Sequence, residues 1–330
     1  MVLRHEAKNN TLEEIANLLK GAGSALVFPH VSADGDTLGS AVALCAAMRK
    51  LGKESYVVME DKIPDMIAFL SGNFCVYDQR AIERPDVCVM VDCGEWSRIP
   101  RRRALFEAGR HGVCIDHHVT TAPFLEWNHI DSRASAAAEI IHDLIILMGV
   151  EPDAVIMEAI CAGIITDTGK FQYANTGARA HRIMAEFYDR GFSPSDVCVR
   201  LYQNNRLEKE LLESKALARA KFLAGGRAAV ATVTREMLEE CGAMWEDADG
   251  VVEKLRDIKG VEVAAVIKKK RGEHKVSLRS KLSFDAAAFA ETRSGGGHLR
   301  AAGYALRESY EYVEADLIGA LEAYLAGKDG

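Results

Sequence analysis

The sequence is 330 residues long, with 48% apolar residues, 27% charged residues and a formal net charge of −7. This composition is typical of a soluble globular protein and excludes a disordered chain, and the length favours two domains over one. The negative charge argues against a long nucleic-acid footprint, which needs a broad basic face, but it leaves room for a short nucleotide held locally.

No segment has the roughly 20 consecutive apolar residues that cross a bilayer, and the first ten residues lack a signal-peptide core. We therefore expect a cytoplasmic protein with no membrane partner. The eight cysteines include no Cys-x-x-Cys pair, and three of them lie inside apolar runs. This pattern favours buried free thiols in a reducing compartment over a disulfide framework.

Strand-like and helix-like segments alternate in the first half of the chain, as in a parallel sheet that helices cover on both faces. Short apolar runs predict buried strands at residues 25–29, 56–59, 87–91 and 112–115. Helical spacing predicts helices over residues 39–51, 134–148 and 154–165, although Ile164 and Ile165 could equally be extended. We predict an α/β domain over residues 1–192.

A charged segment rich in Leu and Ala follows at residues 193–223, where Pro194 after Ser193 suits a capped helix start. We predict a linking helix there. Strands return at residues 228–233, 261–268 and 274–280, and the last two form a predicted hairpin. Residues 224–330 are therefore predicted to form a smaller α/β domain with a mixed sheet.

Acidic and histidine side chains lie where four apolar runs end, and each run reads as a strand. They are His30, Asp34 and Asp36 after the first run, Asp92 after the second, Asp116, His117 and His118 after the third, and Asp167 at the end of the fourth. Because the carboxyl ends of parallel strands meet at one edge of a sheet, we expect these side chains to converge. One such aspartate alone would suggest a turn or a helix cap, whereas the ordered set predicts a metal site.

The chemistry of this set suggests which ion it binds. Carboxylate and imidazole without thiolate suit Mn²⁺, with Mg²⁺ less well matched, and argue against structural zinc. Two ions roughly 3.5–4 Å apart, bridged by a shared carboxylate, would use all the ligands, lower the pKa of a shared water and offset the charge on a phosphate. The candidate ligands are His30, Asp34, Asp36, Asp92, His117 and Asp167.

These motifs resemble those of the DHH phosphoesterase superfamily. The segment from His30 to Asp36 is similar to its first motif, Val91-Asp92 to its second, Asp116-His117-His118 to its third, and Thr166-Asp167-Thr168-Gly169 to its fourth. Gly295-Gly-Gly-His298, with Ala301-Ala-Gly303, resembles the signature of the accompanying DHHA1 domain. The two-domain layout is most similar to the NrnA-type group of bifunctional oligoribonucleases and 3′-phosphoadenosine 5′-phosphate (pAp) phosphatases.

The resemblance implies a role for each site residue. His30 and Asp34 would bind one Mn²⁺, and Asp92 would bridge it to a second ion. The ligands of that second ion would be Asp36, His117 and Asp167. His118 would position or protonate the phosphate, although a role limited to orienting ligands stays open.

In the second domain the resemblance implies that Arg279 and His298 contact the substrate. Arg279 suits a phosphate because its planar fork pairs with two oxygens. Gly296 and Gly297 would let the backbone approach an anion closely. Seven basic residues and one acid lie between residues 268 and 281, and we expect Lys268 to Arg271 to form a solvated hairpin tip.

The chain departs from the family pattern at Ser135 to Ala138, where hydroxyl residues are common, and at Gln172, where arginine is common. Details of phosphate or base recognition therefore stay open. Arg98 and Arg101 to Arg103 follow the second motif closely, and we expect them on the solvated surface rather than in contact with substrate. No motif supports a homodimer through the sheet-side helices, although the fold would allow one.

The leading hypothesis is a Mn²⁺-dependent exonuclease on short RNA that also removes a phosphate from pAp. One alternative is a cyclic or linear dinucleotide phosphodiesterase acting on c-di-AMP or pApA. A second is a nucleotide- or RNA-binding module without catalysis, against which the intact ligand set argues.

Overall fold

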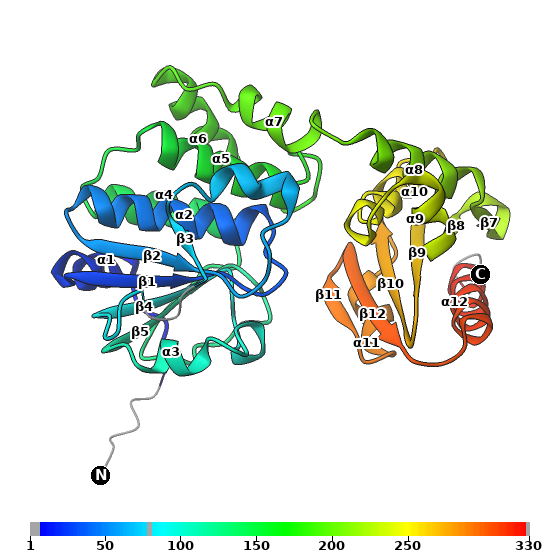
Figure 1. The fold of residues 1–330 in the computed structure, drawn as a ribbon, viewed down its shortest axis with the longest axis horizontal. Helices are drawn as coiled ribbons and strands as arrows, with labels where there is room; N and C mark the ends of the chain where they lie inside the picture. Colours follow the sequence, from blue (N-terminus) through cyan, green and yellow to red (C-terminus); the bar gives the residue numbers. More distant parts are fainter. Residues whose placement is uncertain (1–6, 78–80, 328–330) are drawn as a thin grey trace, which may run out of the picture. The chain divides into compact units, whose positions relative to one another are not determined.

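The computed structural model describes residues 7–77 and 81–327, and at His298 the backbone alone. The chain divides into two compact units, residues 1–204 and residues 205–330 (Figure 1). None of the helices described in either unit is long and apolar enough to cross a membrane.

The first unit is built on a six-stranded sheet in which every pairing is parallel. In spatial order its strands are β3 (Cys75–Val76), β2 (Glu54–Val58), β1 (Ser24–Phe28), β4 (Val87–Val91), β5 (His111–Asp116) and β6 (Trp127–Ile130). From β1 the chain continues through β2 to β3 at one edge of the sheet, and from β4 it continues through β5 to β6 at the other edge. Loops that leave the carboxyl ends of β1 and β4 therefore diverge and open a crevice, the usual ligand position in such sheets.

Helices lie on both faces of this sheet, which confirms the predicted α/β class. The main core packs one face of the sheet against α1 (Leu12–Gly21), α2 (Gly35–Lys50), α4 (Ala137–Leu147) and α5 (Ala154–Asp167). A smaller core packs the other face against η2 (Trp96–Arg98) and α3 (Arg103–Glu107). The remaining helices of the unit are η1 (Asp65–Leu70), α6 (Ala178–Asp189) and α7 (Pro194–Tyr202).

The helix α5 corrects one prediction, because Asp167 ends this helix rather than a strand. The run Ala154 to Ile165 is almost entirely apolar because most of α5, from Ala159 to Ile165, is buried between α2 and other helices. Close approach of α2 and α5 requires small residues: a Cβ on Gly39 would lie 2.3 Å from the carbonyl oxygen of Ala159. The ligand set therefore comes from three strand ends and one helix end.

The predicted single linking helix is two helices. α7 packs Val197 and Leu201 in the core of the first unit, whereas α8 (Leu207–Ala218) packs Leu212 and Ala216 in a core of the second. Each helix packs into the core of a different unit, and the helical structure is interrupted between them at residues 203–206. The domain limits at residues 192 and 223 stay predictions.

The second unit has a mixed sheet, as predicted. In spatial order its strands are β11 (Gly296–His298), β12 (Ala301–Leu306), β10 (Glu273–Ser280), β9 (Val263–Lys270), β8 (Ala228–Val233) and β7 (Lys221–Leu223). Only the β8–β9 pairing is parallel. One face packs on α8, α9 (Arg235–Cys241), η4 (Trp245–Ala248) and α10 (Val251–Arg256), the other on η3 (Ala224–Gly226), α11 (Ala286–Glu291) and α12 (Tyr310–Ala326).

Candidate metal centre

The first cluster of site residues lies where β1 leads into α2. His30 follows the strand by two residues, and its side chain is 5% exposed. Asp34 is the N-cap of α2, because one of its carboxylate oxygens accepts hydrogen bonds from the backbone N–H groups of Asp36 and Thr37. Its other oxygen lies 3.7 Å from His30 Nε2. A strand end and a helix cap thus bring these two side chains together.

Asp92 follows β4 and has a left-handed backbone conformation, with a φ angle of 55°. This conformation is uncommon for residues other than glycine, although aspartate and asparagine adopt it more readily than most. The side chain is 4% exposed, and its two oxygens point to different partners. Asp92 Oδ2 lies 3.5 Å from His30 Nε2, and Asp92 Oδ1 lies 3.4 Å from His117 Nε2.

His117 connects Asp92 to a second group of acids. Its Nε2 atom lies 3.8 Å from Asp36 Oδ2 and 3.6 Å from Asp167 Oδ2. The ring is oriented by its other nitrogen, because Nδ1 lies 3.2 Å from the carbonyl oxygen of Ala134. Two groups of potential ligands result, His30 with Asp34 and Asp92, and Asp36 with His117 and Asp167, and within each the ligand atoms lie within 4.8 Å of one another.

Buried charge in this cluster shifts the pKa values strongly. Burial would lower the pKa of His30, but the carboxylates of Asp34 and Asp92 raise it to about 10. Burial also opposes the charge on Asp92, yet His117 and His30 hold the pKa of its carboxyl well below the usual range. Burial, together with the charge of Asp92, raises the pKa of Asp36 to about 7. Protons on the imidazoles thus balance the acids where no cation does.

The geometry fits divalent ions. An ion with ligands at 2.0–2.1 Å holds opposite ligands about 4.2 Å apart, so atoms within 4.8 Å of one another need only small movements to surround it. Asp92 Oδ1 is fully buried and finds no hydrogen-bond donor among the described residues. An acceptor left without a donor in a buried acidic cluster suits a cation.

The N-terminus of α4 holds Asp36 in place. Asp36 Oδ2 accepts a hydrogen bond from the backbone N–H of Ala137 at 2.6 Å, and Oδ1 accepts one from Ala138 at 2.9 Å. Ala136, the N-cap of α4, has no side chain that could satisfy these donors. The departure from hydroxyl residues at positions 136–138 thus leaves the support of Asp36 intact, since that support comes from the backbone.

His118 lies beside the ligands and is fixed by Asp116. Its Nδ1–H donates to Asp116 Oδ1 at 2.7 Å, and the hydroxyl of Thr121 donates to the other oxygen of Asp116 at 2.6 Å. His118 Nδ1 also lies 3.5 Å from Asp92 Oδ1, so His118 forms a third potential ligand group with Asp92 and His117. The sequence placed Asp116 in the motif but did not reveal that it orients His118.

Asn175 was not predicted as a site residue. Its side-chain amide donates to the carbonyl oxygens of Ser135 and Asp167, at 2.9 and 3.0 Å, and lies 3.4 Å from Asp167 Oδ2. The same amide therefore holds the end of α5 against the segment that precedes α4. No short motif predicts this contact, because its partners are eight and 40 residues away along the chain.

We expect Asn175→Ala to weaken divalent-metal binding by about 10- to 100-fold, the usual cost of losing a residue that orients a metal ligand. Metal titration by calorimetry measures the change. The matched control is Asn205→Ala, because the Asn205 amide bonds to the side chains of Glu210 and Lys209, neither of which is a candidate metal ligand. Equal metal affinity in the two variants would contradict the positioning role.

In the second unit, Arg279 is already paired. Its Nε–H donates to Glu253 Oε1 at 2.8 Å, and Nη1 donates to the carbonyl oxygen of Leu278 at 3.0 Å. These contacts hold the guanidinium between α10 and β10 and leave Nη2 without a hydrogen-bond partner among the described residues. The predicted phosphate contact of Arg279 stays a prediction, and the His298 side chain lies outside the described residues.

The glycines of β11 differ in what they do. Gly297 has a φ angle of 142°, and a Cβ there would lie 2.5 Å from the carbonyl oxygen of Ala301. A Cβ on Gly295 would lie 2.3 Å from the carbonyl oxygen of Gly303. Both glycines are thus required by the close packing of β11 on β12. Gly296 has open space where its Cβ would be, so packing does not explain this glycine. Its predicted role in letting the backbone approach an anion closely stays a prediction.

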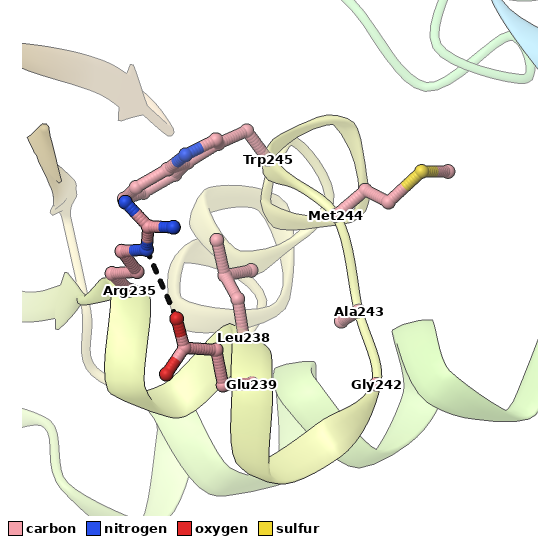
Figure 2. Close-up of a pocket in the computed structure, with 7 residues that line it drawn as sticks. All are labelled: Arg235, Leu238, Glu239, Gly242, Ala243, Met244 and Trp245. Carbon is pink, nitrogen blue, oxygen red and sulfur yellow. Dashed lines mark hydrogen bonds and ion pairs between the residues drawn. The ribbon is translucent and has the colours of Figure 1, made fainter.

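A shallow pocket of about 460 Å³ also lies in the second unit, between α9 and η4. Figure 2 shows Arg235 and Trp245 side by side at its rim, where Arg235 is paired with Glu239 at 2.9 Å. The pocket has no cluster of metal-binding groups among its lining residues. It is therefore not the candidate reaction centre.

Comparisons with known proteins found relatives of both units. The model of the DHH family, N-terminal domain, matches residues 24–164, and the DHHA1 domain model matches residues 225–327. The bifunctional oligoribonuclease and PAP phosphatase NrnA of Thermus thermophilus is 32% identical over 91% of each chain. NrnA of Bacillus subtilis is 26% identical over 88% of this chain and 90% of its own length.

Solved structures show the same fold. An exopolyphosphatase-related protein from Bacteroides fragilis superposes with a TM-score of 0.90 at 24% identity, over 97% of both chains. The exonuclease RecJ bound to manganese superposes with a TM-score of 0.55 at 17% identity, over 97% of this chain and 95% of its own. At these identities the likeness concerns the fold alone.

Proposed function

The chain belongs to the DHH family, and on that premise we propose that it is a two-metal phosphoesterase acting on short oligoribonucleotides and on pAp. The observation that carries the proposal is the position of Asp92, whose two carboxylate oxygens each lie near a different ligand group. The similarity to NrnA enzymes extends over both units, so it includes the DHHA1 domain as well as the candidate metal centre.

We assign the ligands as the sequence predicts them. His30 and Asp34 would hold one ion, Asp92 would bridge it to a second, and Asp36, His117 and Asp167 would be the other ligands of that second ion. Mn²⁺ is the proposed ion, with Mg²⁺ as the alternative. The mixed carboxylate and imidazole donors support this choice, as does the manganese in a RecJ structure of similar fold.

Two divalent ions at this site supply an activated water and offset the charge that builds on the phosphate oxygens. The protein's own residues fix the geometry. Asp92 lies between the two ligand groups, with one carboxylate oxygen near each. The backbone amides of Ala137 and Ala138 in α4 fix the orientation of Asp36. Asp116 binds His118 Nδ1, so Nε2 is the nitrogen of His118 that can exchange a proton with the leaving oxygen.

For His118→Gln we expect kcat to fall by about 10²- to 10⁴-fold, the usual contribution of a positioned acid or base. Mn²⁺ affinity should stay within a few-fold of the wild type, because the assigned ligands do not include His118. Single-turnover hydrolysis and metal titration measure the two effects separately. A parallel loss of Mn²⁺ affinity would make His118 a ligand, and an unchanged kcat would leave it only an orienting role.

The substrate class is tested with four compounds in the presence of Mn²⁺: a five-nucleotide RNA, pAp, pApA and c-di-AMP. We expect turnover of the RNA and of pAp. Turnover of the dinucleotides alone would favour the phosphodiesterase alternative. The similarity to the cyclic-di-AMP phosphodiesterase GdpP of Geobacillus thermodenitrificans, 25% identical, covers only 49% of that protein and supports the alternative less well. Binding of RNA without turnover of any compound would favour a binding module.

A further inference from the structure

One face of the second sheet is covered by helices over β8 and β9, and α10 reaches β10 through the ion pair of Glu253 with Arg279. β12 contributes no residue to the core on this face. The core on this face draws its buried residues from α8, α9, η4, α10, β8 and β9. The buried apolar residues of β10 and β12 all belong to the core on the opposite face. They are Val276, Leu278, Ala302 and Tyr304. Since side chains alternate along a strand, the residues between them point to the face that carries α10.

The register of β10 and β12 places basic and small residues next to each other on this face. Arg279 pairs with Ala301, Ser277 with Gly303, and Lys275 with Ala305. No partner on β12 is larger than alanine, so no bulky side chain from that strand stands beside the polar groups of β10. Two residues of strand span about 7 Å, so Arg279, the hydroxyl of Ser277 and Lys275 form a row of evenly spaced donors.

The charge of Lys275 is not neutralised by its surroundings. Lys275 is exposed and has no hydrogen bond or ion pair in the part of the chain that the structure describes. Of the neighbours on its face, Lys268 is paired with Asp249, and Glu273 lies 3.9 Å from Arg307. Burial, followed by the charges of Lys275 and Lys268, lowers the pKa of Lys270. On this face of β10 the charge of Arg279 is therefore balanced by Glu253, whereas that of Lys275 has no partner among the described residues.

We propose that Ser277 and Lys275 extend the predicted Arg279 phosphate site into a track for further phosphates of a single-stranded oligonucleotide. This inference rests on the proposed function. The spacing of the donors is comparable to that of neighbouring phosphates in an extended single strand. Because pAp loses one of its two phosphates to hydrolysis, it has at most one left for this face, whereas a five-nucleotide RNA has several. Lys275 would therefore favour the longer substrate over pAp.

The experiment compares Lys275→Gln with Lys269→Gln. Both variants remove one lysine charge from the same hairpin, but Lys269 lies on the opposite face, with its Nζ 4.3 Å from the centre of the Tyr310 ring. For Lys275→Gln we expect KM for a five-nucleotide RNA to rise about fivefold, the upper range for an exposed ion pair. KM for pAp should change less than about twofold, and kcat should be unchanged. Lys269→Gln should resemble the wild type on both substrates.

Salt dependence gives a second readout. The slope of log KM for the RNA against log salt concentration should fall by about 0.7 in Lys275→Gln, the value for one phosphate contact on a single strand. Anisotropy of a labelled five-nucleotide RNA in EDTA measures the same contact without hydrolysis. Equal RNA affinity of the two variants in that assay would overturn the track, whether or not the protein is active. Failure of the wild type to hydrolyse RNA and pAp would instead overturn the proposed function.

Discussion

Asp92→Asn is expected to lower hydrolysis of both pAp and short RNA by about 10³-fold or more. Two ions stabilise the charge on a phosphate by several kcal/mol, and each 1.36 kcal/mol changes the rate about tenfold. Asparagine keeps the size of the side chain but removes the charge that lies near both ligand groups. Steady-state rates show the loss of activity, and metal analysis of the purified variant should show fewer than two ions per chain.

The choice of asparagine matters because Asp92 has a positive φ angle. Asparagine adopts this conformation more readily than alanine, so Asp92→Asn separates the loss of charge from backbone strain. Asp189→Asn is a suitable control, because Asp189 is an exposed residue at the end of α6. A doubly occupied and active Asp92→Asn variant would contradict the bridging role.

The elements that carry the ligands could be predicted because their sequences are short apolar runs bounded by polar residues. β4 occupies the predicted residues 87–91, and β5, at residues 111–116, contains the predicted residues 112–115. The end of α5 could not be predicted, because a helix buried on all sides and a buried strand have the same apolar pattern. β11 and β12 were not predicted as strands either. Gly295 and Gly297 are needed for close contact with the backbone of the neighbouring strand, and a glycine run alone does not indicate such a neighbour.

Arg102 shows why the surroundings of a charged residue could not be predicted locally. It was expected on the surface, but its side chain is 1% exposed. Its guanidinium donates to the carbonyl oxygen of Pro29 at 2.8 Å and to Glu60 at 3.1 Å. These partners lie more than 40 residues away along the chain. A buried arginine requires such partners, and only the fold brings them together. The partners of Asn175 are likewise brought together only by the fold.

Removal of the metal is expected to destabilise the protein as well as inactivate it. Without cations, the buried carboxyl of Asp36 and the partly buried carboxyl of Asp167 lie close to the charge of Asp92, and this proximity adds to the effect of burial in raising their pKa values. Binding of cations to the folded site relieves this repulsion. A site that binds only the folded state stabilises it by about 2.7 kcal/mol at a ligand concentration of 100 Kd.

For a unit of this size, each kcal/mol raises Tm by about 2–4 °C. Adding Mn²⁺ at 100 Kd to the EDTA-treated protein should therefore raise Tm by about 5–10 °C, as differential scanning calorimetry would show. Asp92→Asn should have a smaller Mn²⁺-dependent shift, since it lacks the carboxylate that lies near both ligand groups. Equal shifts in the variant and the wild type would mean that the stabilising ion binds elsewhere, because Asp92 is the residue that the two proposed ion positions share.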